Sequence, residues 1–265
     1  MMSKAYKEIL WKRTQLKRDA WERKYAYLFR IVLNKQFKKL ADRVKSDNIG
    51  SESLYTVIDR EEIEKAMISL YKHVGASFAQ DQFRRLKAES QALEFKSGPE
   101  AEDYWYEYMT SYAKTKAGAR ITSITGEQKR QARKIITEKM KIATDEGWGS
   151  DELARQIRKA LLTEGQVINQ WRALRIARTE TVTASNIGSH IGAQETGFPM
   201  EKYWIAVYDS RTRDTHAVVE QQNPKAMDEG FRVGDYLMEI PGDPDAGPEE
   251  TINCRCGVGY QVKGM

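Results

Sequence analysis

The chain has 265 residues, of which 40% are hydrophobic and 31% charged, with 6 prolines and a net charge of +5. This composition is typical of an ordered, helix-rich protein, so it excludes a chain that is disordered throughout, and the length allows one large domain or two smaller ones. The two cysteines, Cys254 and Cys256, are too few for a disulfide framework. No stretch approaches the roughly 20 apolar residues of a membrane span, and no secretory apolar segment is found near the start, so we expect synthesis in the cytoplasm.

The first 45 residues are strongly basic. They contain 14 Lys and Arg against 4 acidic residues, a local balance of +10. Such a segment attracts nucleic acid because neutralised phosphates release counterions. The alternatives are a solvated helix face or a surface that docks onto an acidic protein. We predict contact with double-stranded DNA through the bases Lys12, Arg13, Lys17, Arg18, Arg23, Lys24, Lys35, Lys38 and Lys39.

Apolar residues recur every three or four positions through most of the first 195 residues, which predicts a mainly helical region. Residues 1–45 are expected to form one long helix or two, followed by a polar break at residues 46–53. Asp59 and Glu62 have the spacing of a capping box, so the next helix is expected to begin there.

Two more helices are predicted from their start and stop signals. Gly98 and Pro99 open the first of them, which stops at Gly118. Thr125 is the predicted cap of the second, which ends near Gly147.

A domain boundary is predicted at the segment Gly147, Trp148 and Gly149. It divides the chain into a helical, basic N-terminal region, residues 1–147, and a C-terminal domain, residues 148–265. Ser150 is expected to cap a short helix directly after this boundary.

The helix predicted over residues 167–195 carries small side chains along one face. Small residues allow another backbone to come close, so we expect this helix to pack tightly on a partner element. The small residues of this face are Ala173, Ala177, Thr181, Ala184, Gly188 and Gly192.

The pattern changes after residue 199 from a helical period to alternation, which predicts strands. Strands are expected at residues 202–208, more weakly at 231–240, and at 251–262, where both cysteines share one face. The predicted fold class is therefore α+β, with a largely helical N-terminal region and a smaller C-terminal domain of helices packed on a small, mostly antiparallel sheet.

The last 65 residues hold the side chains that best support chemistry. Asp209 and His216 follow a predicted strand, and with Cys254 and Cys256 they make a donor set that fits tetrahedral zinc. The alternatives are two buried structural thiols, or thiols with redox or nucleophilic chemistry. These residues alone do not make a complete catalytic site, and the sequence has no nucleophile elbow, P-loop or dinucleotide motif. We therefore expect no cofactor, with zinc as the alternative.

Arg178 and Glu180 lie on the helix with the small face. We interpret them as a salt bridge that fixes this helix to the sheet.

Several short motifs in order, from about residue 147 to 262, resemble the C-terminal domain of the tailed-phage head morphogenesis proteins, also called Mu F-like minor head proteins. The N-terminal 146 residues match no family that we can name. The residues that carry the resemblance are Ile176, Ala177, Arg178, Thr179, Glu180, Ala184, Asn186, Gly188, Trp204, Asp209, Arg211, Thr212, Arg213, His216, Pro241, Gly242, Asp243, Pro244, Ile252, Asn253, Cys254, Arg255 and Cys256.

The resemblance implies a non-enzymatic, low-copy minor capsid component of the virion, made in the bacterial cytoplasm. Its expected place is the capsid interior near the portal vertex, where it assists procapsid assembly and contacts the portal protein, other head proteins and the packaged DNA. The structural motif residues of this expectation are Arg178, Glu180, Asp209, Arg213, His216, Cys254 and Cys256.

Two other functions stay open. One is an enzyme acting on nucleic acid or nucleotides, either metal-dependent or ADP-ribosyltransferase-like through Arg178 and Glu180. The other is a plain DNA-binding module that the C-terminal domain anchors.

Overall fold

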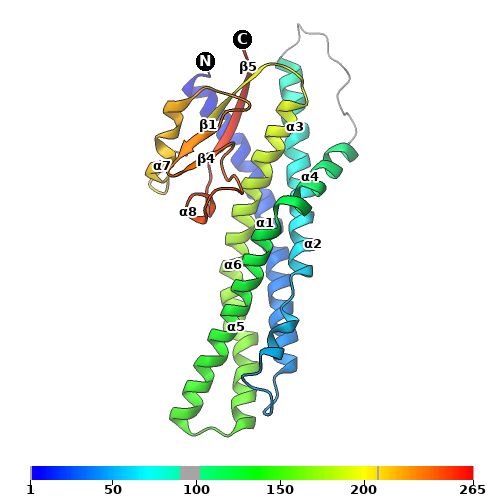
Figure 1. The fold of residues 1–265 in the computed structure, drawn as a ribbon, viewed down its shortest axis with the longest axis vertical. Coiled ribbons are helices and arrows are strands. Elements are labelled where there is room, and N and C mark those ends of the chain that lie inside the picture. The colour runs from blue at the N-terminus through cyan, green and yellow to red at the C-terminus, as the bar shows by residue number, and fades with distance from the viewer. Residues whose placement is uncertain (1, 90–101, 208, 265) are drawn as a thin grey trace. The chain divides into compact units, whose positions relative to one another are not determined.

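A computed structural model describes residues 2–89, 102–207 and 209–264, and the α+β class is confirmed (Figure 1). The chain forms two compact units. Neither is continuous in sequence, because α1 (Lys4–Arg43) and α6 (Ser150–Gln194) each contribute to both. The predicted division at residue 147 stays a prediction. Unit 1 comprises Met1–Arg23, Ile68–Lys116 and Arg178–Met265, and unit 2 comprises Lys24–Met67 and Ala117–Ala177.

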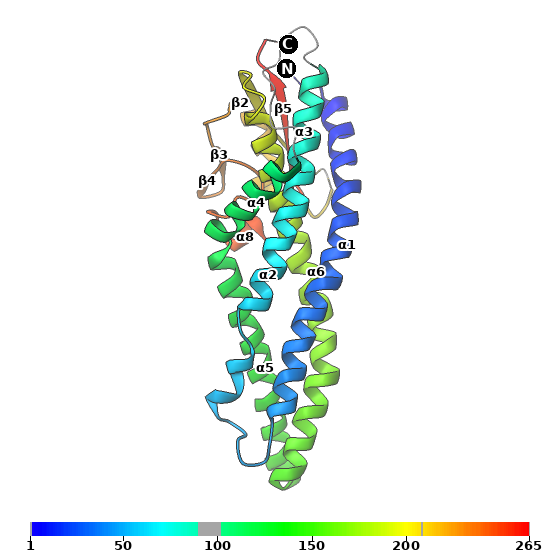
Figure 2. The same cartoon turned by 90° about the vertical axis from the view of Figure 1, so that its right-hand side faces the viewer.

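The basic N-terminal segment forms one long helix, α1, and the predicted break follows it. Within unit 2, α1 lies alongside α5 (Gly118–Glu146) and the first part of α6 (Figure 2). The short helix η1 (Glu52–Val57) adds to the same core. The periodic apolar residues face inward as predicted, and the buried core includes Phe37, Leu40, Val44, Leu54, Ile135, Ile157 and Leu161.

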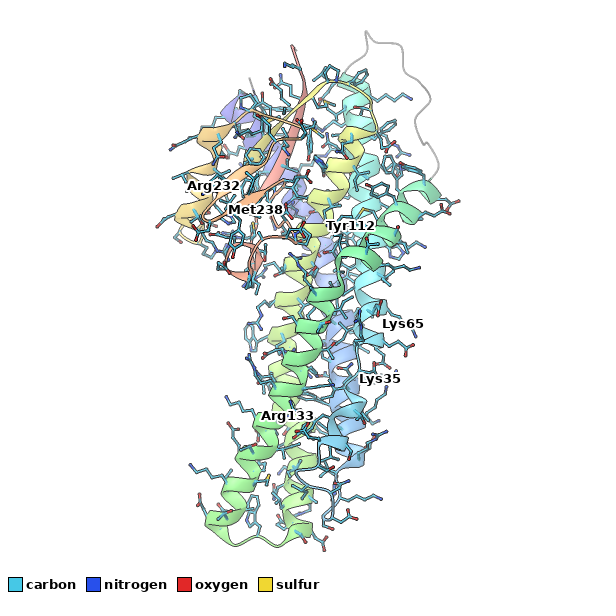
Figure 3. All side chains as sticks on the ribbon, in the orientation of Figure 1. Lys35, Lys65, Tyr112, Arg133, Arg232 and Met238 are labelled. Carbon is cyan, nitrogen blue, oxygen red and sulfur yellow. The ribbon has the colours of Figure 1, made fainter. Side chains whose placement is uncertain are left out.

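Charged side chains hold α1 to α2 (Glu61–Leu70) inside unit 2. Figure 3 labels Lys35 of α1 and Lys65 of α2. The Nζ atoms of Lys35 and Lys39 lie 2.7 and 3.1 Å from Glu62 Oε1. Asp59 accepts a hydrogen bond of 3.0 Å from the backbone N–H of Glu61, which confirms the predicted helix start.

The helix that begins at Glu61 continues through a π-helical turn, η2 (Tyr71–Gly75), into α3 (Ala76–Glu89). The next helix, α4, is described over Glu102–Lys116. Its predicted opening at Gly98 and Pro99 lies outside the described residues.

Two predictions about helix ends are wrong. Thr125 is no cap, because it lies inside α5 and its hydroxyl donates 2.8 Å to the carbonyl of Ile121. The short helix predicted after Ser150 and the helix predicted over residues 167–195 are the single helix α6. Gly165 lies between the two predicted helices, and in α6 a Cβ there would lie 2.3 Å from the Phe37 ring, so this ring leaves little room for a larger residue.

The glycine face of α6 packs onto the backbone of η2 and α3, as predicted. A Cβ added to Gly188 would lie 2.1 Å from the carbonyl oxygen of Gly75, and one added to Gly192 would lie 2.2 Å from that of Ala79. The helices therefore approach each other at backbone distance here.

The main sheet has three antiparallel strands, with β1 (Met200–Ile205) between β2 (Lys225–Ala226) and β5 (Gly257–Val262). The segment predicted as one strand over 231–240 is a hairpin, β3 (Phe231–Val233) and β4 (Tyr236–Met238), turned at Gly234 with φ 56°. Figure 3 labels Arg232 and Met238 on this hairpin. Residue 208, the predicted end of the first strand, lies outside the described residues.

The strand predicted over 251–262 begins only at Gly257. Pro248 instead starts a short helix, α8 (Pro248–Thr251), and Asn253 turns the chain with φ 57°. Cys254 and Cys256 are therefore in the loop that leads into β5. Both are nevertheless buried, in one cluster with Trp204, Phe231 and Met238.

Among the described residues, no helix combines the length and the apolar character that crossing a membrane requires.

Candidate functional site

His216, Cys254 and Cys256 come together in unit 1. His216 is on the short helix α7 (Asp214–Ala217), and the cysteines precede β5. Each side chain is 2% exposed. His216 Nδ1 lies 3.4 Å from Cys256 Sγ and 3.7 Å from Cys254 Sγ, and the three atoms lie within 4.8 Å of one another. Imidazole nitrogen and thiolate sulfur are the ligands that zinc uses in proteins.

Glu250, on α8, binds the second nitrogen of the same imidazole. Its Oε2 lies 2.9 Å from His216 Nε2 and accepts a second hydrogen bond of 2.9 Å from the hydroxyl of Thr215. Because a carboxylate only accepts, the proton of the neutral ring is on Nε2, and the Nδ1 lone pair faces the two sulfurs. Sequence reasoning missed Glu250, since nothing in the chain distinguishes it from the neighbouring Glu249.

Proton affinities in this cluster follow from its burial and its contacts. Burial opposes the charged imidazolium, but the hydrogen bond to Cys254 and the nearby carboxylate of Glu250 outweigh it and raise the pKa of His216. When the ring also carries a proton on Nδ1, hydrogen bonds from Cys256 and from this imidazolium lower the pKa of Cys254 well below its usual value, against the effect of burial.

Arg18 is buried beneath the same loop, although the sequence placed it among the DNA-binding bases. Its Nη2 donates 2.5 Å to Asn186 Oδ1, its Nε donates 2.7 Å to the hydroxyl of Ser185, and its Nη1 donates 3.1 Å to the carbonyl of Cys256. The side chain is 1% exposed, and burial lowers the pKa of Arg18 to about 10. The structure thus places this arginine in the protein interior, away from solvent.

Two charged residues of the motif hold the loop from outside. Asp209 pairs with Arg255 through contacts of 2.5 and 2.7 Å, which hold the pKa of Asp209 well below its usual range. Arg213 donates 2.6 Å to the carbonyl of Ile252. The structure therefore places Asp209 on Arg255, outside the group formed by the histidine and the cysteines, and its carboxylate is not in the set that could hold a metal.

Polar residues of α6 bind the backbone of two loops around the site, one that contains Pro241 and Gly242 and one that contains Asn253 and Cys256. Asn186 Nδ2 donates to the carbonyls of Pro241 and Cys256, at 2.8 and 3.2 Å. Thr183 donates 2.8 Å to the carbonyl of Gly242. The hydroxyl of Thr179 accepts 3.1 Å from the backbone of Asn253. Motif residues that are distant in sequence therefore lie close together, because side chains of α6 bind the loops that carry the others.

Arg178 and Glu180 contact helices, whereas the sequence interpretation joined them to the sheet. Arg178 pairs with Glu22 of α1 at 2.9 Å. Glu180 is buried and accepts 2.8 Å from the hydroxyl of Tyr71. They point away from each other along α6 because residues two apart on a helix do not share a face.

The other predicted DNA-binding bases differ in exposure. Lys17 is partly buried and pairs with Asp81 at 2.5 Å, and Lys39 is partly buried on Glu62. The exposed members of the set are Lys12, Arg13, Arg23, Lys24, Lys35 and Lys38.

Comparison with known proteins confirms the resemblance over much of the expected stretch. Residues 134–259 match the family described as Phage Mu protein F like protein. A curated protein of Enterococcus faecalis, named NAD(+)--arginine ADP-ribosyltransferase EFV, is 29% identical over 152 residues, which are 56% of this chain and 30% of that protein. The chain thus spans less than a third of the length of this relative. No solved structure matches the chain.

Proposed function

We propose, from the premise that residues 134–259 are Phage Mu protein F-like, that this protein is a component of a phage head. The family match carries the proposal. The site geometry supports a structural role, because the motif residues described above hold two loops on α6 and bury a histidine and two thiols beneath them. We further propose that the protein is a low-copy component bound near the portal vertex, where it assists procapsid assembly.

Incorporation at the portal is tested by co-assembly. A tagged chain is produced together with the portal, scaffolding and major capsid proteins of its phage, and the particles are separated by sedimentation. We expect the chain to sediment with procapsids and to be absent from particles assembled without the portal protein. A chain that stays at the top of the gradient, or enters both kinds of particle equally, contradicts the proposal.

DNA contact is proposed for the exposed bases of the N-terminal segment. Binding of the full chain to double-stranded DNA is measured by fluorescence anisotropy over a range of salt concentrations. We expect affinity without sequence preference, and a salt slope that falls by about 0.9 for each phosphate contact removed. The variant replaces four exposed bases of α1 by glutamine: Lys12, Arg13, Arg23 and Lys24.

The matched control removes the same number of exposed positive charges elsewhere. It replaces Lys114, Lys116, Lys134 and Lys141 by glutamine. The two variants have the same net charge, so a smaller salt slope only in the α1 variant identifies that helix as the contact. Equal slopes in the two variants contradict the proposal.

ADP-ribosyl transfer is a second candidate function, favoured by the name of the curated relative. We rank it lower because Arg178 is paired with Glu22 and Glu180 is buried against Tyr71, so the two residues form no joint site. Release of nicotinamide from NAD⁺ by the purified chain distinguishes the candidates, since the head-protein proposal expects none.

A further inference from the structure

We propose that His216, Cys254 and Cys256 bind one zinc ion and that Glu250 orients the histidine for this role. This metal site is independent of the proposed function. The three donor atoms lie within 4.8 Å of one another in the buried interior of unit 1.

The spacing of the donor atoms agrees with a tetrahedral centre. With Zn–S and Zn–N bonds of about 2.3 and 2.0 to 2.1 Å, a tetrahedral arrangement separates a ligating nitrogen from a ligating sulfur by about 3.6 Å. The observed distances from His216 Nδ1 to the two sulfurs are 3.4 and 3.7 Å. A zinc ion therefore requires little movement of these three side chains.

The chemistry of the donors selects the class of metal. Two thiolates and an imidazole are soft and intermediate ligands that suit zinc, whereas magnesium and calcium require oxygen. Two thiolates also neutralise the charge of the ion, which removes most of the cost of burying it.

In zinc sites, a ligating histidine commonly donates its other ring N–H to a carboxylate, and Glu250 provides that carboxylate here. Its hydrogen bond to His216 Nε2 leaves Nδ1 as the metal-binding nitrogen and fixes the plane of the ring. Thr215 in turn holds the carboxylate by its own hydrogen bond. This arrangement of carboxylate, histidine and sulfurs favours a metal site over two thiols buried merely as small apolar groups.

The fourth ligand is assigned to water. The three donors line a small pocket together with Val207, Thr212, Asn253 and three arginines, Arg211, Arg213 and Arg255. Three protein ligands and one water complete a four-coordinate zinc. The ion would join α7 to the loop before β5, two segments nearly forty residues apart in sequence.

The test uses the full chain, purified under reducing conditions and loaded with zinc or cobalt. We expect about one zinc per chain, and with cobalt the thiolate charge-transfer and intense d–d bands of a four-coordinate site. Cys254→Ser and Cys256→Ser should lose the metal. His73→Gln is the control and should retain it, since His73 is bonded to the Ser69 carbonyl at 2.7 Å, away from the site. Glu250→Gln should weaken zinc binding by about 10 to 100-fold while keeping the thiolate spectrum.

Several results would overturn the proposal. A wild-type chain that takes up no zinc, or whose cobalt complex lacks thiolate bands, has no such site, and this measurement does not depend on any variant folding. Metal content that is unchanged in both serine variants places the metal elsewhere. Unchanged zinc affinity in Glu250→Gln removes the role of that carboxylate. Chelation of the wild-type chain should also lower its melting temperature, because zinc binding contributes to folding.

Discussion

Gly188→Ala is expected to destabilise the protein by about 3 kcal/mol, because the new methyl group has no space. Its Cβ would lie 2.1 Å from the carbonyl oxygen of Gly75 and 2.8 Å from the carbonyl carbon, and neither is a side-chain atom that can rotate away. The two backbones must separate instead. The free energy of unfolding, measured by urea denaturation with circular dichroism, provides the test.

Gly126→Ala is the control for this prediction. Gly126 is also in a helix, α5, but it is exposed, and no atom lies within 4 Å of its added Cβ. Alanine should therefore stabilise the protein there by about 0.5 to 1 kcal/mol, since it has the higher helix propensity. If Gly188→Ala matches this control, the close approach of the helices is wrong.

Arg18→Met should cost about 1 to 3 kcal/mol of unfolding free energy. Methionine fills much of the same volume but donates no hydrogen bond, so the side-chain oxygen of Asn186 and the carbonyl of Cys256 lose a buried donor. The oxygen of Asn186 is left without a partner, which costs about 1 to 3 kcal/mol, whereas the carbonyl of Cys256 keeps the hydrogen bond from Asn186 Nδ2. Chemical denaturation of the purified variant measures the loss.

Arg13→Met serves for comparison, because it removes the same charge from an exposed position of the same helix. Its effect on stability should stay within about 0.5 kcal/mol. Equal stability of the two variants would show that Arg18 contributes nothing to the interior.

Patterns that repeat along the chain could be predicted from the sequence. The apolar period of residues 21–44 places Phe37, Leu40 and Val44 in the core, where the structure has them. Alternation also identified β1 and β5. These predictions work because the apolar face of a helix or strand is recognised from many residues at once, so one residue that departs from the pattern does not change the assignment.

Features decided by a single tertiary contact could not be predicted. Gly165 lies between the two helices predicted from the sequence, and only the fold shows that the Phe37 ring packs over it inside one continuous helix. Arg18 is indistinguishable from its basic neighbours until Asn186 and Ser185 are brought beside it. Glu250 acquires its role only when α8 places it against His216. In each case the partner is distant in sequence, so composition and period do not reveal it.

The paired glycines of α6 also determine its register. Gly188 and Gly192 meet Gly75 and Ala79, so the contacts are four residues apart on both sides. If α6 slid by one turn so that Gly188 met Ala79, Ala184 would oppose Gly75, and its methyl group would collide with the carbonyl there. The two glycines therefore exclude a shift of the helix in that direction. The position of α6 along its axis also determines where Thr179, Thr183 and Asn186 meet the loops that they bind. Two glycines on one face of α6 thus align the hydrogen bonds made by another face.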